Sequence, residues 1–323
     1  MTLHLDSAVI KQLCDEQIAY DAAQLALDGQ RQGNFQLPTR MDVNVPTGFF
    51  RAMPAALDEY MGAKIMTLAK GVGNRYLLLV YLQKTGELLA MLDASEVTRL
   101  RTAATTALAG NLLRPEGTSV LGIIGTGFEA EGHLRAFAQL WPLTKVHVFS
   151  RSVEKRQEFA DRLGKDLGLE VEPVDRVEDV TSVCPVTVLC TKATEPVVDG
   201  TSFAPDAVVL SIGSTRPDLR ELDVATFARA RTVLVDDLES VVAESGDVTS
   251  AITAGAVERE SFVSMADWTG NFGADGGDKD LSIFKSVGTA LQDLALAAVL
   301  IKNATDRGLG REIGDITELK AVK

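Results

Sequence analysis

The feature that most constrains the fold of this chain is a glycine-rich segment near its middle, Gly122-Ile-Ile-Gly125-Thr-Gly127-Phe-Glu-Ala130. It stands between an apolar run typical of a strand and an amphipathic run typical of a helix. In this setting Gly125 permits a tight turn, Gly127 lets the backbone approach a pyrophosphate, and Ala130 keeps the helix close to the strand. The segment, with Thr126 inside the turn, therefore predicts a dinucleotide site in a Rossmann fold.

The residues around this motif alternate short β-branched runs with helical stretches at Glu129–Leu140 and Val153–Leu167. Such alternation predicts a doubly wound parallel sheet with helices on both faces, in the α/β class. The expected strands are Ser119–Ile124, Lys145–Ser150, Glu170–Val174, Val186–Thr191, Ala207–Ile212 and Thr232–Val235.

The end of the second expected strand bears on the choice of nucleotide. Sites specific for NAD usually place an acidic residue there, which binds the ribose 2′-hydroxyl. This chain has Ser150-Arg151-Ser152 instead, with one arginine and no carboxylate. Arg151 is suited to a 2′-phosphate, to which Ser150 and Ser152 would donate hydrogen bonds, although Arg151 alone also fits a solvated turn. The pattern favours NADP(H), with NAD(H) as the alternative.

The first 116 residues have a different pattern and form the expected N-terminal α+β domain, with the Rossmann domain at residues 117–302. The boundary is expected at Arg114-Pro-Glu-Gly117, where proline and glycine interrupt the pattern. A helix is expected from about Ser7 to Gln32, followed by a segment at Leu37–Pro54 that is punctuated by Pro and Gly. Strands are expected at Gly62–Ala69, Tyr76–Leu82 and Leu88–Asp93, with a turn at Lys84–Gly86. A helix capped by Ser95 should reach Leu113, and a late helix is expected at Ser286–Ala304.

Composition excludes several classes of function. The net charge of −13 argues against nucleic acid or an anionic membrane as partner. No apolar run reaches the roughly 18 residues needed to span a bilayer, and Leu77–Leu82 is too short for this. The N-terminus lacks the pattern of a signal peptide, so we expect a cytoplasmic protein. The three histidines are not spaced for a metal, so we expect no metal site. Lysine, arginine or a carboxylate must then supply any acid–base chemistry.

Segments along nearly the whole chain resemble the ornithine cyclodeaminase/mu-crystallin family. In the family's order they are Pro38-Thr-Arg40, Ala52-Met53-Pro54-Ala55, Gly62-Ala-Lys64, Leu92-Asp-Ala94, Thr98-Arg-Leu-Arg101-Thr102-Ala103-Ala104, Ile212-Gly213-Ser214, Arg220-Glu221-Leu222, Glu244-Ser-Gly-Asp247 and Phe284-Lys-Ser286-Val-Gly288. The resemblance implies a substrate-binding and dimerisation domain at the N-terminus, completed by about residues 303–323, and a homodimer. It also implies hydride transfer between a nicotinamide and the α-carbon of an amino or imino acid.

Three basic residues, Arg40, Lys64 and Arg101, match the family's pocket. Arginines clamp an α-carboxylate well, and a lysine can move protons if burial lowers its pKa. We expect Arg40 and Arg101 to hold the carboxylate and Lys64 to orient or protonate the imine nitrogen. Arg101 could instead serve a cofactor phosphate, and Lys64 could be a snorkelling residue at a strand edge.

Further site residues are expected at the carboxyl ends of later strands, where ligands bind in such sheets. Thr191, Ser211 and Gly213 are expected cofactor contacts, together with Val287 in the last matching segment. Thr215 stands where ornithine cyclodeaminases carry an aspartate. This difference argues against ornithine cyclisation, although the neighbouring Asp218 could partly substitute.

The sequence thus favours NADPH-dependent reduction of a cyclic α-imino acid, such as pyrroline- or piperideine-2-carboxylate. An ornithine cyclodeaminase or an amino-acid dehydrogenase are the alternatives within the same chemistry. A mu-crystallin-like, NADPH-modulated binding protein is the alternative of another class.

The segment Trp268–Lys279, rich in Gly and Asp, lacks the family's Gly-Arg pattern and is expected to be a flexible loop.

Overall fold

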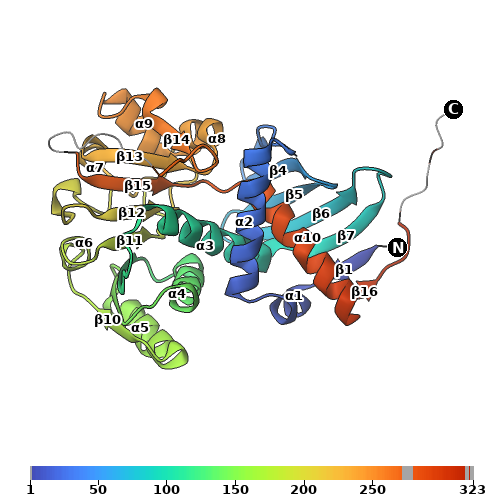
Figure 1. The fold of residues 1–323 in the computed structure, drawn as a ribbon, viewed down its shortest axis with the longest axis horizontal. Coiled ribbons are helices and arrows are strands. Elements are labelled where there is room, and N and C mark those ends of the chain that lie inside the picture. Colours follow the sequence, from blue (N-terminus) through green and yellow to red (C-terminus); the bar gives the residue numbers. More distant parts are fainter. Residues whose placement is uncertain (1, 271–278, 317–319, 321–323) are drawn as a thin grey trace. The chain divides into compact units, whose positions relative to one another are not determined.

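The computed structural model describes residues 2–270, 279–316 and 320, so most of the Trp268–Lys279 segment lies outside the described residues. The chain divides into two compact units, one formed by Met1–Arg101 with Thr289–Lys323 and the other by Thr102–Gly288 (Figure 1). The boundary between the units lies inside the long helix α3 (Ala94–Leu113), directly after Arg101. Each unit has its own eight-stranded sheet.

The unit Thr102–Gly288 is built on a parallel sheet. Its strands are β8 (Val120–Ile124), β9 (Lys145–Phe149), β10 (Glu170–Pro173), β11 (Val186–Leu189), β12 (Val208–Ser211), β13 (Ala230–Val235), β14 (Phe262–Ser264) and β15 (Leu281–Lys285). They lie in the order β10-β9-β8-β11-β12-β15-β13-β14, and neighbours pair in parallel. The chain turns back across the sheet between β8 and β11, which is the switch point at which doubly wound folds bind dinucleotides. The expected Rossmann fold is confirmed.

The helices of this unit cover both faces of the sheet (Figure 1). They are α4 (Phe128–Leu140), α5 (Val153–Leu167), α6 (Glu178–Thr181), α7 (Val224–Ala228), α8 (Leu238–Glu244) and α9 (Gly246–Thr253), with 3₁₀ turns at Gly200–Ser202 and Arg259–Ser261. Every residue of β11, β12 and β15 is buried, as expected for parallel strands covered on both sides.

The other unit is an α+β structure with a largely antiparallel sheet. Its strands are β1 (Leu3–Leu5), β2 (Phe35–Gln36), β3 (Met41–Val45), β4 (Gly48–Leu57), β5 (Tyr60–Ala69), β6 (Gly73–Leu82), β7 (Leu88–Asp93) and β16 (Arg311–Glu312). They lie in the order β16-β1-β7-β6-β5-β4-β2, with β3 paired to β4. Burial alternates along β6 and β7, so one face of the sheet is covered and the other is not.

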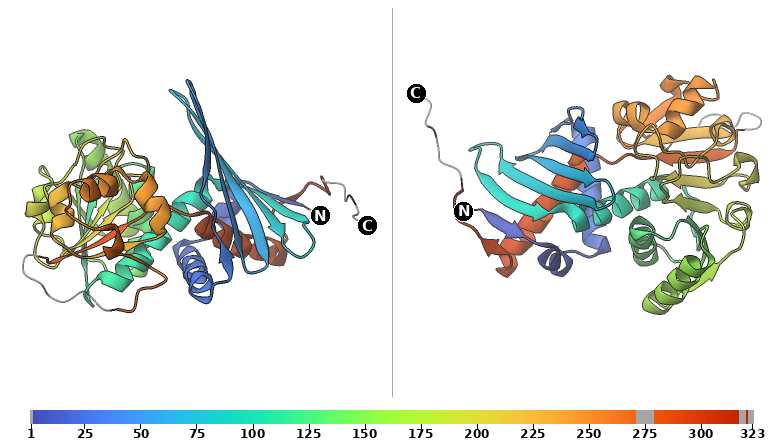
Figure 2. Two further views of the ribbon diagram at one scale, coloured as in Figure 1. Left: turned by 90° about the horizontal axis from the view of Figure 1, so that it is seen from above. Right: turned by 180° about the vertical axis from the view of Figure 1, so that it is seen from behind.

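The long helix α10 (Ala290–Arg307) packs against the covered face of this sheet, and the long helix α2 (Glu16–Gln32) and the short α1 (Ser7–Leu13) pack against α10. The helices lie in front of the strands in Figure 1, and the strands lie in front of the helices in the view from behind (Figure 2). The covered face carries Leu78, Val80, Ala90 and Leu92, each at most 1% exposed. Lys64 lies on this face as well, because it stands directly opposite Leu78 in the antiparallel register.

One expectation for the N-terminal region was wrong. The helix expected from Ser7 to Gln32 is two helices, because the Asp15 carboxylate accepts a hydrogen bond from the Ile18 N–H (2.9 Å) and starts a new helix. No strand was predicted in the segment Leu37–Pro54. The structure places β3 and most of β4 there, and β4 continues through Pro54 to Leu57.

Two helix starts also differ from the expected positions. Helix α3 begins at Ala94, and the Asp93 carboxylate, not Ser95, accepts a hydrogen bond there, from the Ser95 N–H (3.0 Å). Helix α10 begins at Ala290, because Thr289 and Gln292 form a reciprocal capping box. No helix in the described ranges is both long and apolar enough to cross a membrane.

Candidate active site

A fully buried lysine is the centre of the candidate site in the N-terminal unit. Lys64 lies in the middle of β5, is 2% exposed, and places its Nζ 2.7 Å from Oδ2 of Asp293 in α10. Arg101 of α3 donates from Nε to the other oxygen of Asp293 (3.0 Å) and from Nη1 to Oε1 of Gln292 (2.8 Å). Three segments distant in sequence thereby bring two cations onto one buried carboxylate.

The start of α10 holds this carboxylate in place. Thr289 and Gln292 fix the first turn through the capping box, and the same Gln292 side chain accepts from Arg101. Asp293 follows in that first turn, where the helix dipole favours a negative charge. The capping interaction and the ion pairs therefore support the same position of Asp293.

Electrostatics make Lys64 an unusual lysine. Burial lowers its pKa from 10.5 to about 8; Asp293 opposes this shift, while the charges of Arg101 and Arg40 add to it. Burial acts to raise the pKa of Asp293, but Arg101 and Lys64 outweigh it and hold that pKa below its ordinary value. A lysine of this kind, which shares its carboxylate with Arg101, can give and take a proton near neutral pH.

Arg40 lies just before β3 and is half-buried. Its charge acts on both Lys64 and Asp42, so it belongs to the same electrostatic group. Asp42 also receives two hydrogen bonds from Arg51 of β4, at 2.7 and 2.6 Å. The three basic residues identified in the sequence thus act on one region of the N-terminal unit.

Sequence reasoning missed Asp293 and Gln292, which hold the cluster together. The available signal was a carboxylate inside the apolar run from Leu291 to Leu300, where an unpaired charge would be costly. Nothing local indicated its partners, because Arg101 lies 192 residues away in the chain.

The glycine-rich turn of the other unit fits the phosphates of a dinucleotide. Gly125 has φ of +122°, and a Cβ there would approach the Cys190 carbonyl oxygen to 2.6 Å, so the tight turn requires glycine. Gly127 is the N-cap of α4, receives no side-chain cap, and has open space where a Cβ would stand. Ala130 is fully buried against the sheet. The helix N-terminus behind Thr126 can therefore accept an anion.

The loop after β9 uses its serines internally. Ser152 caps α5 by accepting from the Lys155 N–H (3.2 Å) and donates to Glu154 (2.9 Å), while Ser150 donates to the Ser152 carbonyl (3.1 Å). Arg151 is exposed and forms no ion pair with the residues that the structure describes. Unlike the two serines, Arg151 is therefore not engaged in these contacts within the loop.

The remaining expected cofactor contacts lie at the carboxyl ends of the central strands. Ser211 is the buried last residue of β12, and Thr191 and Gly213 follow β11 and β12. All three donate hydrogen bonds to Glu221. Val287 follows β15 and directs its N–H toward Asp236 (3.4 Å).

The loop that carries Thr215 does not present a free carboxylate at this edge. Thr215 donates from its backbone N–H to the Gly213 carbonyl (3.0 Å). Asp218 is bound through both oxygens by Arg216, at 2.9 and 3.0 Å, and the hydrogen bonds from Arg216 lower its pKa. Asp218 is therefore already paired within its own exposed turn.

Among the described residues no group of three or more His, Cys, Asp or Glu is arranged to hold a metal ion.

A parallel sheet of this order with a glycine turn at its switch point is typical of the dinucleotide-binding proteins of the Rossmann class. The N-terminal unit adds a feature that the Rossmann fold alone does not have, the buried cluster of Lys64, Arg101 and Asp293. Residues 3–308 match the ornithine cyclodeaminase/mu-crystallin family, and the chain is a member of that family. The resemblance seen in the sequence is thereby confirmed.

Three relatives illustrate the similarity. Ketimine reductase mu-crystallin of Mus musculus is 31% identical over 286 residues, which cover 85% of this chain and 87% of the mouse protein. The structure of Thermococcus litoralis Δ1-pyrroline-2-carboxylate reductase with NADH and L-proline has a TM-score of 0.89 and 26% identity, covering 96% of this chain and all of that one. An archaeal alanine dehydrogenase dimer with bound NAD has a TM-score of 0.89 and 28% identity, with 97% and 99% covered.

Proposed function

We propose that this chain uses NADPH to reduce a cyclic α-imino acid to the corresponding amino acid. The broader class, an NAD(P)H-dependent oxidoreductase acting on C=N bonds, is that of its relatives. The observation that carries the proposal is the buried Lys64, whose pKa is lowered to about 8 beside Arg101 and a shared carboxylate. Such a group suits an imine nitrogen, which must gain a proton as its carbon is reduced.

In this proposal each residue of the cluster has a separate task. Arg101 uses Nε and Nη1 for Asp293 and Gln292, and its Nη2 has no hydrogen-bond partner among the described residues, so those N–H groups can bind the substrate carboxylate. Arg40 adds a second positive charge for the same carboxylate. Protonated Lys64 donates to the imine nitrogen and polarises the C=N bond. A reduced nicotinamide, when bound, supplies the hydride for the α-carbon.

The pH dependence of the rate tests the role of Lys64. A proton donor is active below its pKa and inactive above it, so kcat/KM should fall about tenfold per pH unit above pH 8, the pKa of Lys64. The measurement is a kcat/KM profile from pH 6 to 10 at constant ionic strength. A rate that stays level to pH 10, or one that rises through pH 8, would show that protonated Lys64 is not the donor.

The substrate is tested by following NADPH oxidation with cyclic imines of different ring size and with 2-oxo acids plus amines. Turnover of one cyclic imine is the expected result. Release of proline and ammonia from ornithine without net NADPH consumption would identify a cyclodeaminase, which the paired state of Asp218 and the presence of Thr215 disfavour. NADPH binding with no turnover across the panel would favour a small-molecule-binding protein.

The preference for NADPH is proposed on the basis of Arg151. Replacing it with alanine should raise the KM for NADPH about tenfold, the order expected for one charge-assisted phosphate contact, and leave the KM for NADH unchanged. The matched control is Arg176→Ala, whose side chain is 69% exposed and pairs with Glu178. Equal effects on both nucleotides would remove the basis for the NADPH assignment.

We also propose a homodimer through the uncovered face of the N-terminal sheet. Met41, Val43, Val45 and Phe50 are 40 to 60% exposed, and the register places Phe50 opposite Val43 on the same face of the β3–β4 hairpin. An apolar surface of this kind marks an interface. Light scattering should give twice the chain mass of 34.6 kDa, and a monomer mass at micromolar concentration would contradict the proposal.

A further inference from the structure

A second buried polar cluster lies under the carboxyl edge of the parallel sheet, in the unit Thr102–Gly288. Lys285, Asp247, Ser211 and Glu221 are each at most 1% exposed. The Nζ of Lys285 lies 3.1 Å from Oδ2 of Asp247 and donates to the Ser211 hydroxyl (2.8 Å). That hydroxyl in turn donates to Oε2 of Glu221 (2.8 Å). The cluster therefore holds two carboxylates and one lysine inside the protein.

The Glu221 carboxylate connects the ends of two central strands. Its Oε1 accepts from the Thr191 N–H after β11 (2.5 Å), and its Oε2 accepts from the Gly213 N–H after β12 (2.8 Å). The approach at Gly213 is so close that a Cβ there would stand 2.3 Å from Oε1 and 2.0 Å from the Thr191 carbonyl. The positions of both backbone segments are thus set by one side chain.

Burying these charged groups lowers the stability of the fold, because each loses its hydration. Lys285 is in ion-pair contact with Asp247, whose other oxygen accepts from the Glu221 and Leu222 N–H groups (2.7 and 3.1 Å). Burial raises the pKa of Glu221, which Lys285 only partly opposes. Well-packed apolar residues stabilise a core at least as well as buried ionic groups do. A carboxylate that bonds two loop N–H groups at a ligand-binding edge is therefore better explained by what those loops do.

We propose that Glu221 is a positioning residue for the nicotinamide half of the dinucleotide. The first strands of a doubly wound sheet, β8 and β9, take the adenine half, and the strands beyond the switch point, β11 and β12, take the other half. Glu221 acts through the Thr191 and Gly213 backbone, at the ends of those later strands. The inference rests on the proposed use of a nicotinamide dinucleotide.

The test compares whole and half cofactor on two variants, Glu221→Gln and Glu221→Asp. Glutamine keeps the shape but replaces one acceptor oxygen by a donor, and aspartate keeps the charge but is too short to reach both N–H groups. We expect both to weaken NADPH binding about tenfold or more by calorimetry, because charge-assisted bonds are lost. Binding of adenosine 2′,5′-bisphosphate, which carries only the adenine half, should stay within about twofold of the wild type.

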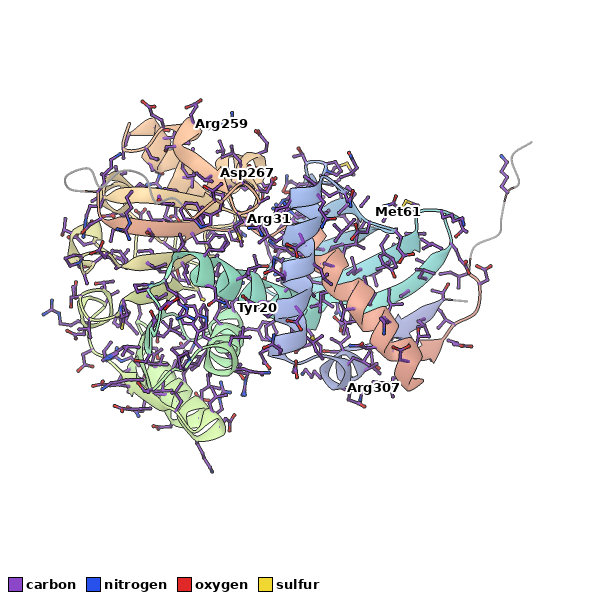
Figure 3. All side chains as sticks on the ribbon, viewed as in Figure 1. Tyr20, Arg31, Met61, Arg259, Asp267 and Arg307 are labelled. Carbon is purple, nitrogen blue, oxygen red and sulfur yellow. The ribbon has the colours of Figure 1, made fainter. Side chains whose placement is uncertain are left out.

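A matched control is Glu239→Gln, in the same unit. Glu239 pairs with Arg259 at the surface, its side chain is 76% exposed, and Arg259 lies at the outer edge of this unit in Figure 3. This variant should bind both ligands as the wild type does.

Three outcomes would overturn the role of Glu221. These are an equal loss of NADPH and bisphosphate binding, unchanged NADPH binding, and loss of the cooperative thermal transition in both variants, since the last would make Glu221 a requirement of folding. Failure of the wild-type chain to bind NADPH or NADH would refute the proposed cofactor instead, so the two failures are distinguishable.

Discussion

Lys64→Met is expected to lower kcat/KM for the imine substrate by about a thousandfold, the order that a positioned proton donor contributes. Methionine fills a similar volume in the buried site but has no proton to give and no charge to polarise the C=N bond. Asp293 keeps its contact with Arg101 in this variant, so the carboxylate is not left without a cation. The chain should therefore fold, and its affinity for NADPH should stay near that of the wild type.

The measurement is steady-state kinetics on the best cyclic imine, with NADPH affinity and thermal unfolding measured on the same preparations. Lys70→Met is the matched control, because Lys70 is exposed, lies in the turn directly after the same strand, and donates from its side chain to the Pro46 carbonyl (2.8 Å). A Lys64→Met enzyme within tenfold of the wild type would refute the role of Lys64. Parallel loss of rate and of NADPH affinity would indicate a folding defect.

Asp293→Ala is expected to reduce stability by about 3 to 5 kcal/mol, since it leaves two buried cations without their carboxylate. Lys64 and Arg101 are 2% and 5% exposed, so water cannot compensate for the loss. The same change should abolish measurable turnover, because the two cations repel each other and Lys64 loses the carboxylate that keeps its pKa up. Asp293→Asn should be milder in stability but should move the alkaline limb of the pH profile below pH 8.

Urea unfolding of the variants tests this prediction. Asp306→Ala is the control on the same helix, since its pair with Lys302 has side chains 59% and 73% exposed and should contribute less than about 1 kcal/mol. If Asp293→Ala lost no more stability than Asp306→Ala, the buried carboxylate would not be what holds the cluster together.

Much of the dinucleotide unit could be predicted from local pattern. The turn at Gly125–Ala130 and the following helix depend on steric rules within a few residues, and the structure has them where they were expected. The strands β9 and β11 begin at the predicted residues for the same reason. The strand β4 was not predicted, because tertiary context decides it: β4 continues through Pro54 and pairs with β5 along its whole length.

In the candidate site too, some residues could be predicted from the sequence and others could not. The sequence by itself determined the dinucleotide fold, because glycine geometry and strand–helix alternation are local properties. The resemblance to the family indicated Arg40, Lys64 and Arg101, and of these only Lys64 also stands out locally, as a charged residue in an apolar run. Only the tertiary structure decided that Asp293 joins Lys64 to Arg101 and that Glu221 joins Thr191 to Gly213. Those pairings depend on which buried charges meet in space. Desolvation makes each costly unless a partner from elsewhere in the chain is present, and no local pattern specifies that partner.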